Sequence, residues 1–203
     1  ANGPLVISLT LDQKNTNVLY ATTNDNDVIK SVDGGKSWQN IFKGNSPVLK
    51  VAIDRSNSDL IYILDQSGSV SVSLDGGKKF VDISSRIEDS SFFSRSFTMV
   101  ETDPTHSERV YLVGGSGIMR SDDAGKNWKK VVALDNPENF PIVTLAINPY
   151  NSDEIIYGAA QASFASVDGG TNWTPFQFAV NKKTSVIQYD PQNPSTVYLG
   201  FSK

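Results

Sequence analysis

The sequence contains no cysteine, a single histidine and no long hydrophobic run. Without cysteine there is no disulfide framework, no thiolate zinc or iron–sulfur site and no cysteine nucleophile. One histidine, His106, is too few for a histidine-based metal site, and it is the only residue that a serine–histidine–aspartate triad could use. We therefore expect neither a metal nor another cofactor.

Basic residues and long apolar segments are also scarce. The 18 lysines and arginines are outnumbered by 22 acidic residues, which gives a net charge of −4, whereas a nucleic-acid surface needs a basic stripe. The longest apolar runs have only a few residues, as at 131–134, so we expect no membrane span and no remaining signal peptide. The 203 residues, 38% of them hydrophobic, suffice to bury a core without covalent cross-links.

An eight-residue segment, which we call the box, recurs four times. It follows the template S-x-D-x-G-x-x-W/F, and its aspartates lie 42, 48 and 45 residues apart. This spacing is the length of a four-stranded propeller blade. The template residues are Ser31, Asp33, Gly35 and Trp38; Ser73, Asp75, Gly77 and Phe80; Ser121, Asp123, Gly125 and Trp128; and Ser166, Asp168, Gly170 and Trp173.

A second marker repeats in phase with the box. An aspartate or asparagine precedes a tyrosine by eight or nine residues, and turn-forming residues such as Asp103-Pro104 lie between them. Apolar runs on both sides predict an inner strand, a turn and a second strand, with the box closing a hairpin between a third and a fourth strand. The marker pairs are Asp12 and Tyr20, Asp54 and Tyr62, Asp103 and Tyr111, Asn148 and Tyr157, and Asp190 and Tyr198.

The residues of the box are suited to folding that hairpin. Its aspartate can accept hydrogen bonds from backbone N–H groups of its own turn, and its glycines supply positive φ angles at no steric cost. The tryptophan or phenylalanine starts the next strand and packs its ring under the turn. We therefore interpret the box as structural.

These segments resemble the Asp-box, or bacterial neuraminidase, repeat over nearly the whole chain. In that family the boxes lie on the periphery of a β-propeller, between the third and fourth strands, and have a structural role. The wording D-P-x-x-P-x-x-V-Y-L-G at 190–200 is most similar to photosystem II assembly factors, sortilin-type receptors and xyloglucanase propellers. The resemblance also implies a location outside the cytoplasm: periplasmic, lumenal or secreted.

The repeats predict an all-β fold, a single β-propeller segment over 1–203 with about four and a half blades. There are five markers but four boxes, because a fifth box would fall beyond Lys203. Open strand edges promote aggregation unless they are covered, so we expect a segment of a longer propeller or a partial ring completed by another chain. The predicted blades are 4–46, 47–84, 97–135 and 141–180, with a half blade at 184–203 and an insertion loop at 84–96.

The sequence offers few candidates for catalytic residues, and we assign none. His106 is interpreted as part of a turn, and the five arginines lie at no equivalent blade positions, which argues against the arginine cluster of a sialidase. Hydrolysis of glycans by paired carboxylates stays open, because xyloglucanase propellers carry the same box. Glu101, at the end of an inner strand, is the candidate acid. The alternative function is therefore a polysaccharide-active, xyloglucanase-like glycoside hydrolase fragment with a glycan ligand.

The insertion at 84–96 is the largest departure from the repeat, and such insertions map to binding loops. It contains Phe92 and Phe93 between Arg86 and Arg95, a combination that suits a protein contact or sugar stacking. Alternatively, the loop folds its own phenylalanines beneath itself. We predict a non-enzymatic Asp-box propeller that serves as a protein-binding or assembly scaffold outside the cytoplasm. Its partner would be another protein, or a second copy bound through the open blade edges.

Overall fold

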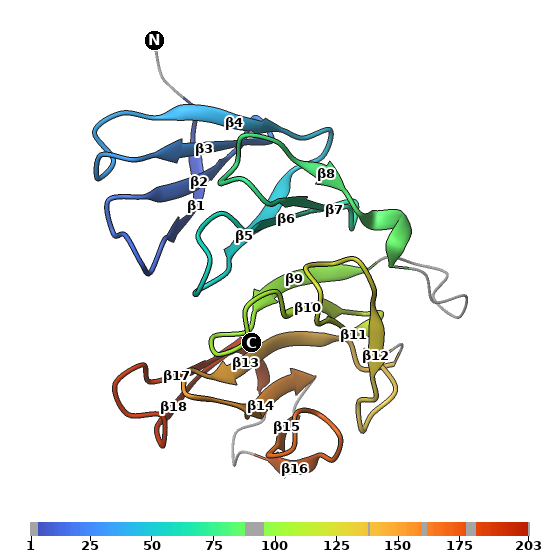
Figure 1. Cartoon of the computed structure of the whole chain (residues 1–203). Coiled ribbons are helices and arrows are strands. Elements are labelled where there is room, and N and C mark those ends of the chain that lie inside the picture. Colours follow the sequence, from blue (N-terminus) through green and yellow to red (C-terminus); the bar gives the residue numbers. More distant parts are fainter. Residues whose placement is uncertain (1–3, 88–95, 138, 160–161, 178–181, 203) are drawn as a thin grey trace.

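The computed structural model describes residues 4–87, 96–137, 139–159, 162–177 and 182–202. Within these ranges, eighteen strands form four four-stranded sheets and one two-stranded sheet, and every hydrogen-bonded pair of strands is antiparallel. Within each sheet the strands follow in chain order, and the sheets succeed one another around the molecule (Figure 1). The chain is thus a partial β-propeller with four full blades and one half blade.

The blades are numbered from the N-terminal end, and the first strand of each blade is its inner strand. Blade 1 comprises β1 (Val6–Leu11), β2 (Leu19–Thr23), β3 (Asp27–Ser31) and β4 (Gln39–Lys43), and blade 2 comprises β5 (Val48–Ile53), β6 (Ile61–Asp65), β7 (Val70–Ser73) and β8 (Val81–Asp82). Blade 3 comprises β9 (Phe97–Thr102), β10 (Val110–Gly114), β11 (Gly117–Ser121) and β12 (Lys129–Val131), and blade 4 comprises β13 (Ile142–Asn148), β14 (Asn151–Ala159), β15 (Ala162–Ser166) and β16 (Thr174–Gln177). Blade 5 comprises β17 (Lys183–Tyr189) and β18 (Val197–Ser202).

The hydrophobic core lies between neighbouring blades. Four clusters of buried side chains join blade 1 to 2, blade 2 to 3, blade 3 to 4 and blade 4 to 5. The marker tyrosines of the first four blades, Tyr20, Tyr62, Tyr111 and Tyr157, are at most 1% exposed, whereas Tyr198 of blade 5 is 59% exposed. The face of a blade that carries the marker tyrosine is therefore buried where another described blade packs on it, and exposed in blade 5.

The four boxes share one hydrogen-bond pattern. In the first box, the Ser31 hydroxyl donates to Asp33 Oδ1 at 2.8 Å and accepts from the backbone N–H of Gly35 at 2.8 Å. Asp33 Oδ1 also accepts from the backbone N–H of Ser37 at 2.9 Å. The same three bonds recur in the other boxes, around Asp75, Asp123 and Asp168.

The last glycine of each box has a left-handed backbone, which a residue without a side chain adopts at low cost. Their φ angles lie between +80° and +89°. The aromatic residue of the box covers this turn in the first blade, where Trp38 Nε1 donates to the Gly35 carbonyl at 3.0 Å. The glycines are Gly35, Gly77, Gly125 and Gly170.

These hydrogen bonds make acid stability a test of the boxes. Donation from the Ser37 side chain and backbone lowers the pKa of Asp33 to about 2, and donation from the Asn172 backbone and amide lowers the pKa of Asp168 to about 2. In the unfolded chain an aspartate has a pKa of about 3.9. Since the folded pKa is the lower one, the stabilisation is complete above about pH 4 and is lost as the pH falls through about 2.

We therefore expect the urea midpoint of the wild-type chain to fall steeply between about pH 4 and 2. The double variant Asp33→Asn with Asp168→Asn should show a shallower fall in that window, with each single variant intermediate. The measurement is a series of urea unfolding curves at fixed ionic strength. Identical pH slopes in wild type and double variant would contradict this role of the two carboxylates.

Candidate functional site

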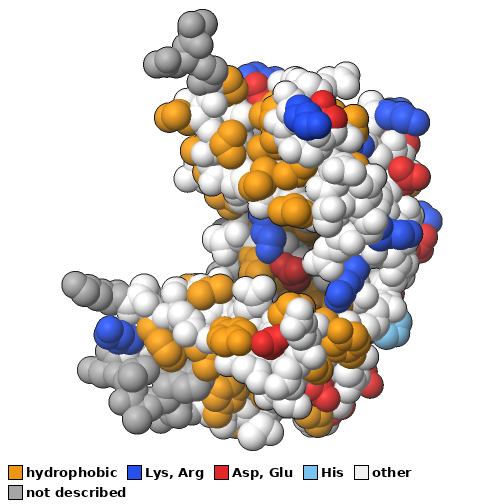
Figure 2. All heavy atoms as spheres, turned by 90° about the vertical axis from the view of Figure 1, so that its left-hand side faces the viewer, with side chains coloured by type: hydrophobic (Ala, Val, Ile, Leu, Met, Phe, Trp, Pro, Cys, Tyr) orange, Lys and Arg blue, Asp and Glu red, His pale blue; other side chains and the backbone are white. Residues whose placement is uncertain are grey.

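A cavity of about 450 Å³ lies on the axis of the partial ring. All five inner strands contribute to its wall, together with the turns that follow several of them. The cavity lies between the two ends of the ring, and the space-filling view shows a hollow with a basic and an acidic side chain at its base (Figure 2). Polar and charged lining residues include Thr10, Gln13, Lys50, Asp54, Arg55, Glu101, Thr102, Thr144 and Gln188.

Threonine side chains tie neighbouring inner strands together around this cavity. Thr10 of β1 donates to the Val51 carbonyl of β5 at 3.2 Å, and Thr102 of β9 donates to the Ile53 carbonyl of β5 at 2.9 Å. On the other side, Thr144 of β13 accepts from the backbone N–H of Ile187 in β17 at 3.2 Å. The described inner strands of different blades belong to different sheets, so they are not joined by backbone–backbone pairing. The threonine hydroxyls instead provide hydrogen-bond partners for backbone groups of neighbouring inner strands.

Glu101, the candidate acid from the sequence, lies in the wall of the cavity. Its Oε2 accepts from Lys50 Nζ at 2.6 Å, across the junction between β9 and β5. Both side chains are about one-third exposed, at 34% for Glu101 and 36% for Lys50, so the pair is accessible from the cavity. An accessible ion pair contributes little to stability and offers both a donor and an acceptor to a ligand.

The second acidic residue in the described lining, Asp54, is saturated with hydrogen bonds. One carboxylate oxygen accepts from the backbone N–H groups of Ser56 and Asn57, at 2.8 and 2.9 Å. The other accepts from the Ser107 hydroxyl at 3.1 Å and the Glu108 N–H at 2.8 Å, both in blade 3. Asp54 is 1% exposed and links two blades.

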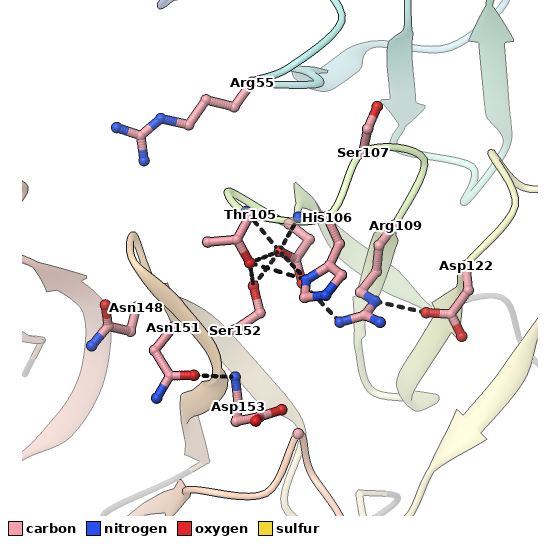
Figure 3. Close-up of polar contacts among 12 residues, drawn as sticks. Arg55, Thr105, His106, Ser107, Arg109, Asp122, Asn148, Asn151, Ser152 and Asp153 are labelled. Atoms are coloured by element: carbon pink, nitrogen blue, oxygen red, sulfur yellow. Dashed lines mark hydrogen bonds and ion pairs between the residues drawn. The ribbon is translucent and has the colours of Figure 1, made fainter.

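The turn after β9 contains a dense polar cluster, shown in Figure 3. The buried Asp103 carboxylate accepts from the backbone N–H groups of Thr105 and His106 at 2.9 Å, and from the Ser152 hydroxyl of blade 4. Its second oxygen accepts from Arg109 at 3.3 Å. Ser152 donates directly to the carboxylate and not through His106, so the cluster lacks the order of a catalytic triad. It joins blades 3 and 4.

Arg109 extends this cluster to the outside of blade 3. Its Nε donates to Asp122 at 2.7 Å, and Asp122 also pairs with Arg120 at 3.0 Å and with Lys129 at 2.7 Å. Partial burial alone would raise the pKa of Asp122, but donation from these three cations holds it well below its usual range. Arg55, from the turn after β5, lies apart from this network in Figure 3 and donates to the Pro149 carbonyl at 3.5 Å.

The insertion at 84–96 is described only in its first part and its last residue. A short 3-10 helix, η1 (Ser84–Arg86), follows β8, with Ile83 and Ile87 buried on either side and Arg86 exposed. The other binding candidates of this loop, Phe92, Phe93 and Arg95, lie outside the described residues.

The described ranges contain neither a metal-binding cluster nor a membrane-spanning helix. No group of three or more histidine, cysteine, aspartate or glutamate side chains is placed to hold a metal ion there. Among the same residues, none of the helical segments has the length and hydrophobicity that crossing a membrane requires.

Neither protein-family models nor curated protein sequences match this chain. Solved structures of β-propellers do match it. An ancestral GH74 enzyme is 20% identical with a TM-score of 0.80, over 98% of this chain and 29% of that one. YCF48 from Cyanidioschyzon merolae is 21% identical with a TM-score of 0.72, over 98% of this chain and 67% of that one. YCF48 bound to D1 peptide is 14% identical with a TM-score of 0.69, over 97% of this chain and 60% of that one.

The chain therefore spans less than two thirds of the GH74 enzyme and of the peptide-bound YCF48. At these identities the similarity shows the β-propeller fold alone. One of the matched folds is an enzyme and another is solved with a bound peptide, so fold does not decide function.

Proposed function

We propose that this chain is a non-enzymatic Asp-box propeller that binds a protein segment at its axial cavity and acts as an assembly scaffold outside the cytoplasm. One observation carries the proposal: both acidic groups of the described cavity lining are already engaged. Asp54 is buried and accepts four hydrogen bonds, and Glu101 is paired with Lys50 at 2.6 Å. Glycoside hydrolysis by the paired-carboxylate route needs one acid to protonate the leaving group and another to act as base or nucleophile.

The rest of the cavity suits an extended polypeptide. Its volume of about 450 Å³ falls in the range typical of ligand sites, and its wall combines aliphatic side chains with a few polar groups. The Lys50–Glu101 pair can exchange hydrogen bonds with both the N–H and the C=O groups of a peptide backbone. The similar fold of YCF48, solved with D1 peptide, supports peptide binding in such a propeller. The location outside the cytoplasm rests on the Asp-box resemblance.

Peptide selection tests this function. Phage-displayed random peptides of about 12 residues, long enough to cross a cavity of this size in extended form, would be selected on the immobilised wild-type chain. The affinity of enriched peptides would be measured by fluorescence anisotropy. The double variant Lys50→Ala with Glu101→Gln removes the ion pair without leaving one charge unpaired. We expect it to bind the enriched peptides about tenfold more weakly, the effect of losing about one charged hydrogen bond.

Lys36→Ala, an exposed change in the first box, is the control and should bind like wild type. The proposal fails if no peptide is enriched, or if the double variant binds as well as the control.

Xyloglucanase-like hydrolysis is the second candidate, and the location of Glu101 in the axial cavity favours it. Incubation with xyloglucan and mixed β-glucans, followed by a reducing-end assay, separates the two functions. As a scaffold, the chain releases no reducing ends. Release that Glu101→Gln abolishes would replace the scaffold proposal with a glycoside hydrolase.

A further inference from the structure

Blade 1 exposes an apolar face that the other blades bury. Val6, Leu9 and Leu11 of β1 are 56%, 52% and 48% exposed. The positions equivalent to Val6 and Leu9, counted back from the marker aspartate or asparagine, are at most 4% exposed in all four later blades. These are Val48, Phe97, Ile142 and Thr184 for Val6, and Val51, Val100, Leu145 and Ile187 for Leu9.

The chain itself shows what covers this face in the other blades. At the first junction, Tyr20 of blade 1 packs in one cluster with Val48 and Val51 of blade 2. The next two junctions repeat the arrangement, with Tyr62, Phe97 and Val100 in one cluster and Tyr111, Ile142 and Leu145 in another. The cover is thus the face of the preceding blade that presents its marker tyrosine.

One such tyrosine face is uncovered. Tyr198 of blade 5 is 59% exposed, and Val186 beside it on the half blade is 50% exposed. Figure 2 looks onto the side between the two ends of the ring and shows hydrophobic side chains above and below the hollow. The exposure at both ends means that blades 1 and 5 of one chain do not bury each other. One chain therefore carries both halves of an interface that it otherwise forms internally.

We propose that two copies of this chain associate head to tail, with the Tyr198 face of one copy packed on the Val6, Leu9 and Leu11 face of the next. The interface is heterologous, because two different surfaces meet, and it leaves one free face at each end of a dimer. It continues the stacking of blades from one molecule into another. The interface adjoins the axial cavity, because Leu11 and Val186 also line that cavity. Leu9 and Tyr198 are not among the lining residues, so substitutions at these two positions test association independently of peptide binding.

A complementation experiment tests the arrangement. Leu9→Asp blocks the face on blade 1, Tyr198→Asp blocks the face on blade 5, and both side chains are exposed, so folding should be preserved. Sedimentation velocity of the wild type should show a mass that rises with concentration above the 22.1 kDa of one chain. Each variant alone should stay at 22.1 kDa, and an equimolar mixture should form a dimer and nothing larger.

Formation of a dimer in the mixture also shows that both variants are folded. The Leu9→Asp variant must supply an intact Tyr198 face, and the Tyr198→Asp variant must supply an intact blade 1 face. Leu74→Asp, at a similarly exposed leucine in the second box, is the matched control and should associate like wild type. Association of Tyr198→Asp alone would indicate pairing of two blade 1 faces and would overturn the proposal. So would a wild-type chain that stays monomeric across a wide range of concentration, or a mixture of the two variants that stays monomeric.

Discussion

Replacing Tyr62 by alanine is expected to lower the free energy of unfolding by about 3–5 kcal/mol, the usual cost of removing a large buried aromatic side chain. The Tyr62 ring is fully buried in the cluster between blades 2 and 3. Tyr198 occupies the same repeat position but is 59% exposed. Its replacement by alanine should cost less than about 1 kcal/mol, mostly through its hydrogen bond to Asp190.

Urea unfolding at low protein concentration measures both variants without a contribution from association. Tyr62→Phe is the control for the ring, because the Tyr62 hydroxyl has no hydrogen-bond partner among the described residues. Removing that hydroxyl should leave stability unchanged or raise it by up to about 1 kcal/mol. Equal losses for Tyr62→Ala and Tyr198→Ala would contradict the assignment of the core to the junctions between blades.

Gly125→Ala is expected to destabilise the protein far more than Gly35→Ala, although both are the last glycine of a box. Their φ angles are similar, +80° and +87°, so both variants incur the left-handed strain of about 1–2 kcal/mol. At Gly125 an added Cβ would lie 2.5 Å from Ile83 Cδ1, whereas at Gly35 the nearest atom is in the Trp38 ring at 3.7 Å. Overpacking should add about 1–3 kcal/mol at Gly125 alone.

The two contributions can be separated by a second substitution. Ile83→Val removes the Cδ1 atom that the new methyl group would meet. In the Ile83→Val variant, the loss of unfolding free energy caused by Gly125→Ala should fall toward the loss caused by Gly35→Ala. Thermal and urea unfolding of these variants give the comparison. If Ile83→Val does not reduce the cost, the overpacking explanation is wrong.

The sequence predicted the all-β propeller fold because the signals that specify it are local. Turn residues after Asp54 or Asp103, and the serine, aspartate and glycines of each box, determine hairpins within a few residues of themselves. Alternating apolar residues then specify the strands between these turns. The half blade followed from counting markers against boxes, and β17 and β18 do form a two-stranded sheet.

The contacts between repeats were not predictable in this way. Nothing in the sequence around Ser152 indicates that it donates to Asp103, or that Asp54 accepts from Glu108 of the next blade. Tyr198 has the same sequence setting as its buried equivalents, and it is exposed because none of the described blades packs on it. The sequence position of Glu101 predicts its place on an inner strand, but its partner Lys50 belongs to another repeat. Such pairs depend on how blades stack, which a single repeat does not encode.

The sequential order of strands within each sheet has a consequence for how such a chain can evolve. Because none of the described strands crosses from one blade to another, a blade can be copied or removed at either end without changing the strand order of the remaining blades. Duplication of the coding sequence for roughly 45 residues would add one blade and move the exposed faces outward by one position. Ring size in this architecture is therefore open to change by recombination, while each surviving hairpin keeps its own ladder of hydrogen bonds.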